Sequence, residues 1–234
     1  MTEPTPKSPL REIIQPFIDL AHAPRALWGL NLSYLLEGFA YFGLAYYMAM
    51  YFSQYVGLGD RQAHLMVAPL TSGITFAMLI LGGRVDRWGV RRTLLTAIVL
   101  MALGRFVLAL APSSGLQGGQ LLSALNGLAL VGILLVVTGF GMYQPALYAG
   151  TRQITTPATS GMAFAMLYAM NNLGGWLPTF MGPIRERFGL AGGIGFYGLV
   201  SVVGLGLVLV ILTARTWSRA VEEARSAAAA PDPE

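Results

Sequence analysis

The 234-residue sequence contains no cysteine and only two histidines, and charged residues make up only 11% of it. Without cysteine the chain forms no disulfide, no thiolate metal site and no cysteine nucleophile. The sequence also lacks a phosphate-binding glycine loop, metal-ligand spacing and a serine nucleophile with a plausible histidine base. It therefore predicts neither an enzyme nor a protein that binds a cofactor or a metal ion.

The basic residues do not indicate a nucleic-acid partner. The 15 lysines and arginines outnumber the 11 acidic residues, but they are scattered among short polar segments rather than gathered on one face. A nucleic-acid-binding protein concentrates its positive charge in a patch or stripe. We therefore expect no nucleic-acid partner for this chain.

What the sequence has in abundance is apolar surface, with 55% hydrophobic residues and a mean hydropathy of +0.59. An ordinary soluble domain carries about 25% charged residues, and a soluble fold rarely exposes large apolar patches. A helix that crosses a bilayer needs about 20 consecutive apolar residues. Six stretches of this kind lie at residues 27–53, 64–83, 93–111, 120–148, 161–181 and 193–214. The sequence therefore predicts an all-α membrane protein with six transmembrane helices.

The segments outside these spans complete the predicted organisation. Residues 1–26 read as a cytoplasmic tail with a short amphipathic helix at the membrane interface, since apolar residues recur every three or four positions there. Residues 27–214 form the bundle, and residues 215–234 form a cytoplasmic helical extension and tail. Charges in the first 25 residues argue against a cleavable signal, so the first helix itself directs insertion.

Orientation follows from the loops. Eleven of the 15 basic residues lie on the side of the two termini and three on the other side, with Arg105 inside a helix. Basic loops remain in the cytoplasm. We therefore expect a multi-pass protein of the cell's inner membrane with both termini cytoplasmic.

The loop between the second and third spans carries the most specific pattern of the sequence, G-G-R-V-D-R-W-G-V-R-R at 82–92. Glycine permits close helix contact at Gly82 and a tight turn at Gly89. Asp86 is a carboxylate able to accept arginine donors or to meet a helix N-terminus. A loop that served only topology would explain the arginines, but not the spacing of glycine and aspartate. The full pattern comprises Gly82, Asp86, Arg87, Gly89, Arg91 and Arg92, of which the last two are expected to anchor the third helix at the headgroups.

This loop resembles the signature loop of the major facilitator superfamily in its residues, its position and its expected side of the membrane. The resemblance implies a conformational latch whose aspartate contacts the opposite half of a twelve-helix transporter. The sequence is similar to the N-terminal six-helix half over essentially its whole length. It therefore implies a second six-helix body as partner, either a separate chain, a second copy, or the rest of a longer protein.

Three further segments resemble the proton-coupled oligopeptide transporter branch: E-G-F-A-Y-F-G at 37–43, G-F-G-M-Y-Q-P at 139–145 and Y-A-M-N-N-L-G at 168–174. This resemblance implies a small polar or peptide-like substrate and proton coupling. The sequence departs from the branch at Tyr34 and Gly38, where the branch has glutamate and arginine. It also departs at Gln144, where the branch has lysine, so substrate and coupling both stay open.

Only two charged side chains, Glu37 and Arg105, lie deep within the spans. Each costs about 2.5–3.5 kcal/mol or more if unpaired at the bilayer centre. Glu37 either faces a transport cavity, where it binds a proton or a cation, or is held neutral or paired by a neighbouring helix. Arg105 is expected to serve as a structural partner, and a pair with Glu37 is one arrangement.

The remaining candidates are hydrogen-bonding and aromatic groups at membrane depth. The predicted substrate or proton site consists of Glu37, Tyr34, Tyr41, Gln144, Tyr168, Asn171 and Asn172. Core packing explains the two first-helix tyrosines equally well. Two functions remain in competition: half of an alternating-access transporter, and a non-transporting scaffold or assembly subunit with the same fold.

Overall fold

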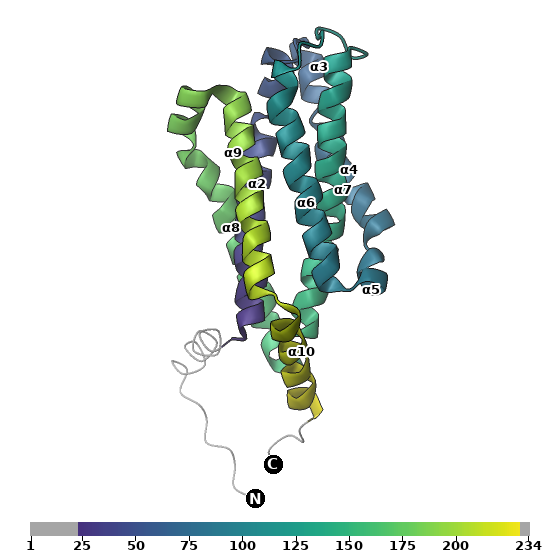
Figure 1. Cartoon of the computed structure of the whole chain (residues 1–234), viewed down its shortest axis with the longest axis vertical. Coiled ribbons are helices and arrows are strands. Elements are labelled where there is room, and N and C mark those ends of the chain that lie inside the picture. The colour runs from purple at the N-terminus through teal and green to yellow at the C-terminus, as the bar shows by residue number, and fades with distance from the viewer. Residues whose placement is uncertain (1–22, 230–234) are drawn as a thin grey trace, which may run out of the picture.

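The computed structural model describes residues 23–229, which form a bundle of helices (Figure 1). The amphipathic helix expected in the N-terminal tail lies outside the described residues. The helices in chain order are α2 (Arg25–Gln54), α3 (Asp60–Leu65), α4 (Ala68–Leu81), α5 (Arg84–Trp88), α6 (Val90–Leu110), the 3-10 turn η1 (Ala111–Ser113), α7 (Ala124–Gln153), α8 (Pro157–Trp176), the 3-10 turn η2 (Leu177–Phe180), α9 (Gly182–Ile211) and α10 (Ala214–Ala229).

Helix lengths agree with a membrane bundle. Four segments are long and apolar enough to cross a bilayer: Asp60–Leu81, Val90–Ser113, Ala124–Gln153 and Gly182–Ile211. Helices α2 and α8 have 30 and 20 residues, but they are less apolar because they carry the amides, tyrosines and carboxylate discussed below. The predicted fold class, an all-α six-helix membrane bundle, is confirmed.

Several helix boundaries differ from those predicted. The second span is divided into α3 and α4, and Pro69 lies in the first turn of α4, where a missing N–H costs nothing. The loop expected at 150–160 is only three residues long, because α7 runs to Gln153 and α8 starts at Pro157. The loop expected at 182–192 is mostly helical and is interrupted at Gly189, whose φ of 69° suits glycine alone.

Glycines bring the central helices together. A Cβ at Gly104 of α6 would lie 2.5 Å from the carbonyl oxygen of Gly132 of α7. On α7, Gly139 contacts Ala97 of α6 and Gly141 contacts Ala77 of α4 at similarly short range. Small residues that let backbones approach are the usual means of packing helices in lipid, where the hydrophobic effect does not drive association.

The packing forms an arc that closes only where α3 packs on α2. Helix α6 packs on α7 and α9, α2 packs on α8 and α9, α4 packs on α7, and α2 touches α7 only sparingly. The order around the arc is therefore α4, α7, α6, α9, α2, α8. Only 11% of the Asp60–Leu81 span is buried, against 61% for Ala124–Gln153, so α4 at one end of the arc is covered on one side only.

Candidate functional site

The two charged side chains at membrane depth meet inside the bundle. Arg105 Nη1 of α6 donates to Glu37 Oε2 of α2 at 2.7 Å, and both side chains are fully buried. Arg105 Nη1 also donates to the hydroxyl of Ser201 on α9, and that hydroxyl donates to the Tyr197 carbonyl oxygen at 3.2 Å. This is the only ion pair within residues 23–229. It ties three helices together on the side of α2 that faces α6 and α9.

The hydrogen bonding of this pair is incomplete. Glu37 Oε1, Arg105 Nε and Arg105 Nη2 are buried and form no hydrogen bond with another group of the described chain. A buried polar atom without a partner costs about 1–3 kcal/mol, and more when it is charged. The pair can therefore accept a further polar partner, and it is less stabilising than a fully bonded one.

A second polar cluster bridges α2 and α7 where these helices barely touch. Gln144 Nε2 donates to the Tyr34 hydroxyl at 3.3 Å, and the hydroxyls of Ser33 and Tyr143 share a hydrogen bond of 2.7 Å. The rings of Tyr34 and Tyr143 lie 6.2 Å apart, centroid to centroid. The structure thus brings two predicted site residues, Tyr34 and Gln144, into contact.

Tyr41 continues this cluster toward the other end of the bundle. Its ring is half-buried and lies 4.8 Å from that of Phe140 on α7, centroid to centroid. The side chains between α2 and α7 are therefore joined by both hydrogen bonds and ring contacts. We call the group formed by Ser33, Tyr34, Tyr41, Phe140, Tyr143 and Gln144 the α2–α7 seam.

The predicted residues of α8 divide between two surroundings. Asn171 is half-buried against α2, where a Cβ at Gly38 would lie 2.9 Å from its Oδ1. Tyr168 is 71% exposed, and Asn172 is exposed and donates from Nδ2 to the Tyr168 carbonyl oxygen at 2.7 Å. Gly38 stands where the related branch has arginine, and only a residue this small allows α8 to approach α2 so closely.

The structure distributes the predicted site residues over different surroundings. The seven predicted residues do not line a single space, because Glu37 turns toward α6 and α9 while Tyr168 and Asn172 lie on the exposed side of α8. Helical spacing places Tyr34, Glu37 and Tyr41 near one another on α2. Helical spacing alone does not tell which of these side chains faces α7 and which faces α6 and α9.

Three residues of these clusters were missed by the sequence reasoning. Ser33 lies one turn before Glu37, and Tyr143 lies inside the segment 139–145, so a search for polar neighbours at helical spacing could have found both. Ser201 is a lone hydroxyl in an apolar run of α9, and no local signal distinguishes it.

The signature loop has the turn that its sequence predicts. Helix α4 ends at Leu81 with Gly82 as its C-cap, α5 follows over Arg84–Trp88, and Gly89 joins α5 to α6 with a φ of 76°. At Gly82 the contact with α7 is of ordinary length, since a Cβ there would lie 3.6 Å from Pro145 Cγ. Asp86 is exposed and forms no hydrogen bond or ion pair with any residue in the described range.

The basic residues of the loop do not all act as headgroup anchors. Arg91 is half-buried, and its Nε donates to the Leu212 carbonyl oxygen at 2.6 Å, just beyond the C-terminal end of α9. A cation at this position stabilises the negative end of the helix dipole and satisfies a terminal carbonyl. Arg91 therefore fastens α6 to α9, whereas Arg87 and Arg92 are exposed.

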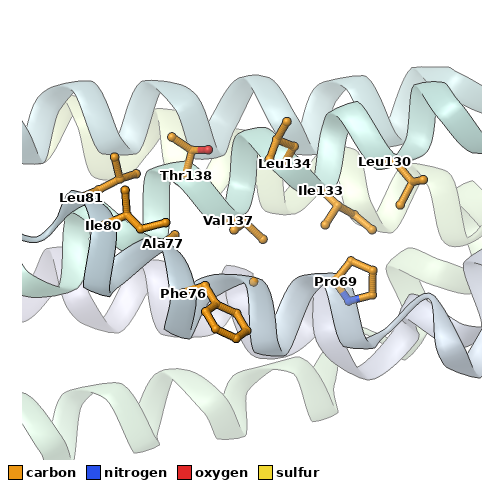
Figure 2. Close-up of a pocket in the computed structure, with 11 residues that line it drawn as sticks. Pro69, Phe76, Ala77, Ile80, Leu81, Leu130, Ile133, Leu134, Val137 and Thr138 are labelled. Atoms are coloured by element: carbon orange, nitrogen blue, oxygen red, sulfur yellow. The ribbon is translucent and has the colours of Figure 1, made fainter.

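An apolar hollow of about 520 Å³ lies between α4 and α7 (Figure 2). Pro69 and Phe76 line it from α4, and Ile133 and Val137 line it from α7. Thr138 is the only lining residue with a polar side chain. This hollow can hold lipid tails or apolar side chains, but it offers only the Thr138 hydroxyl to a polar solute. Nor do three His, Asp or Glu side chains come together as a metal site anywhere in residues 23–229.

Comparisons with known proteins agree with this architecture. A family model described as Major Facilitator Superfamily matches residues 23–232. Dipeptide and tripeptide permease B of Edwardsiella piscicida is 27% identical over 197 residues, which cover 82% of this chain and 37% of the permease. The drug efflux pump JefA of Mycobacterium tuberculosis is 26% identical over 162 residues, or 68% of this chain and 30% of the pump.

A solved structure shares the fold. A crystal structure of a peptide transporter POT in complex with sulfate aligns with a TM-score of 0.68 at 21% identity, covering 80% of this chain and 37% of the transporter. The chain thus spans well under half the length of these relatives.

Proposed function

Because the chain belongs to the Major Facilitator Superfamily, we propose that it is one six-helix half of a secondary active transporter that works by alternating access. Members of this superfamily consist of two six-helix halves related by an axis along the membrane normal. The chain covers 37% of the permease and 37% of the peptide transporter, which suits one half.

The observation that carries the proposal is the arc of helices. Helix α4 is covered on one side only, and its uncovered side is apolar, with Phe76, Leu79 and Ile80 each more than 60% exposed. Helix α8, at the other end, exposes Tyr168, Trp176 and Asn172. A second six-helix body that covered both ends would enclose the side of the molecule where α2 and α7 barely meet.

Within that enclosure, the α2–α7 seam and the α8 amides would meet the substrate. Half-buried Tyr41 and Gln144 offer a hydroxyl, an aromatic face and an amide, and the buried Tyr34 hydroxyl orients Gln144. Asn171 and Asn172 add amides. These groups are neutral, so they suit a small polar or peptide-like solute bound by hydrogen bonds. Relatives named for dipeptides and for drugs both fit such a site. The uncharged Gln144 would hold a substrate carboxylate less strongly than a lysine would.

Glu37 is the candidate coupling group. Proton uptake by its carboxylate would remove the charge that pairs with Arg105, leaving the guanidinium with Ser201 and weakening the link between α2 and the two helices α6 and α9. A conformational change tied to this step would couple proton movement to transport.

The sidedness of the bundle is testable because the chain lacks cysteine, so single introduced cysteines report without background. We propose that the end carrying Asp86 and α10 is cytoplasmic, in the inner membrane. In intact cells, a membrane-impermeant maleimide should label Gln117→Cys, in the opposite connection, but not Arg87→Cys or Ser226→Cys. Labelling in the reverse pattern would overturn the orientation.

Uptake into proteoliposomes tests the function itself. Purified assemblies containing the second body should accumulate a dipeptide or another small polar solute under a proton gradient, and Glu37→Gln should abolish coupled uptake. Glu37→Gln also leaves Arg105 unpaired, so the double variant Glu37→Gln/Arg105→Gln is the control. If the double variant recovers coupled uptake, the pair is structural. Binding of an unrelated assembly protein, without uptake of any solute, would favour the scaffold function instead.

A further inference from the structure

A basic pocket lies outside the transmembrane part, where α10 meets the start of α2. Helix α10 is held against the bundle by Trp217, Ala220 and Val221. The Trp217 ring fits against Gly150 of α7, where a Cβ would approach it to 3.0 Å. Because this apolar face is fixed to the bundle, the exposed arginines of α10 extend from a helix of defined position rather than from a free tail.

The pocket has a volume of about 520 Å³ and is strongly positive. Three arginines line it, Arg25 from α2 and both Arg215 and Arg219 from α10, and Glu223 is the only acidic lining residue. None of these arginines forms an ion pair with a carboxylate of residues 23–229. The pocket therefore carries an excess of two positive charges with no partner in the described chain.

The ends of the two helices add to this excess. The first turn of a helix carries partial positive charge, so acidic residues are stabilising there and basic residues are not. Neither α2 nor α10 has an acidic residue in its first turn, and Arg25 and Arg215 occupy these turns instead. Like charges are thus gathered where each one destabilises the others, and a bound anion would relieve the repulsion.

We propose that this pocket binds the phosphate of an anionic phospholipid headgroup. Arginine pairs with phosphate through two parallel hydrogen bonds, and Thr216, also in the lining, supplies a hydroxyl. The pocket lies within a few residues of the ends of the apolar spans, since α2 begins at Arg25 and α9 ends at Ile211. This is the depth of lipid headgroups, and basic pockets at such helix ends are suited to anionic lipids.

The experiment compares two double variants that lose equal charge at the same end of the molecule. Arg215→Gln/Arg219→Gln removes two arginines of the lining, whereas Arg152→Gln/Arg225→Gln removes two arginines outside it. All four side chains are exposed. Thermal unfolding in an uncharged detergent is followed while phosphatidylglycerol, phosphatidylcholine or inorganic phosphate is titrated. We expect phosphatidylglycerol alone to raise the midpoint of the wild-type chain. We also expect its apparent affinity to fall at least about tenfold in the lining variant and to stay within about twofold in the control.

A gain-of-affinity variant keeps the test decisive if the lining variant does not fold. Glu223→Gln removes the single negative charge of the pocket and should tighten phosphatidylglycerol binding several-fold.

Equal losses of phosphatidylglycerol affinity in the two double variants would show that binding depends only on overall charge, and would overturn the site. A saturable effect of inorganic phosphate that depends on Arg215 and Arg219 would assign the pocket to a free phosphate instead of a lipid. Neither readout depends on transport, so the site and the proposed function fail independently.

Discussion

The polar groups of α2 lie in two regions with opposite surroundings. On the side of α6 and α9, Glu37 and Arg105 are completely enclosed and held by charge. On the side of α7, Tyr34 and Tyr41 take part in neutral hydrogen bonds and ring contacts beside half-buried Gln144. The contrast shows that the most conspicuous charges at membrane depth need not point toward the open side of a bundle. The charged pair links three helices, whereas the neutral seam is buried at Tyr34 and Tyr143 and only partly exposed at Tyr41 and Gln144.

The largest expected effect on stability comes from removing one partner of the buried ion pair. Arg105→Leu would leave the buried Glu37 carboxyl without its charged partner, and removing one partner of a buried ion pair destabilises a protein by about 3–5 kcal/mol. We expect a marked fall in the thermal unfolding midpoint and in the monodisperse yield. The double variant Glu37→Leu/Arg105→Leu, which removes both charges, should recover most of that loss.

Arg61→Leu provides the control, since Arg61 is exposed at the other end of the bundle and should leave the midpoint nearly unchanged. A single Arg105 variant as stable as wild type, or a double variant less stable than the single, would show that the pair does not hold the three helices.

The next largest effect on stability is expected from the close contact between α6 and α7. A methyl group at Gly104 would lie 2.5 Å from the Gly132 carbonyl oxygen, so Gly104→Ala should force α6 and α7 apart and cost about 1–3 kcal/mol. On the exposed side of α7 a Cβ at Gly127 meets nothing within 4 Å. Gly127→Ala should therefore be neutral or slightly stabilising, and chemical denaturation in detergent would measure both. Equal effects of the two alanines would contradict the described helix contact.

A smaller effect on stability is expected in the α2–α7 seam. Tyr34→Phe removes the hydroxyl that accepts a hydrogen bond from Gln144, and such a bond contributes about 0.5–1.5 kcal/mol. If the seam meets the substrate, the apparent KM for uptake should rise by more than this loss of stability explains. Tyr51→Phe is the matched hydroxyl deletion, since the Tyr51 hydroxyl donates to the Leu108 carbonyl oxygen at 2.8 Å outside both polar clusters. It should affect stability without a selective change in KM.

The smallest effect on stability is expected on the open side of α8. Tyr168 is 71% exposed, so Tyr168→Ala should change the free energy of unfolding by less than about 0.5 kcal/mol. Uptake should nevertheless fall if this face borders the substrate path. Loss of stability without loss of uptake would place Tyr168 in a contact with lipid or with the second body.

The fold could be read from the sequence more fully than the site. Apolar stretches of bilayer length gave the number of helices, and the glycine at position 89 gave the turn before α6, because each depends on local sequence alone. The continuation of helix through residues 182–188 could not be read in the same way. Gly, Pro and charge there favour a loop, whereas the observed chain stays helical and breaks only at Gly189.

The site depended on which neighbour each face of α2 meets. Helical spacing grouped Glu37 with Tyr34 and Tyr41. Rotating α2 about its axis by a few tens of degrees would change which of these side chains faces α7 and which faces α6 and α9. Ser201 comes from a helix more than 160 residues away in the chain, and nothing near it in sequence marks it. Arg91 likewise could be placed in a loop, but its bond to the end of α9 is a property of the folded bundle.

The central claim is that this chain is half of a transporting unit, and the mass of the transport-active species tests it most directly. Assemblies would be extracted from native membranes, separated by size with light scattering, and assayed fraction by fraction for uptake after reconstitution. The account predicts that active fractions contain protein of at least about twice the 25.0 kDa of the chain, as two six-helix bodies require. Uptake by a fraction that holds a single copy of this chain and no other protein would contradict it.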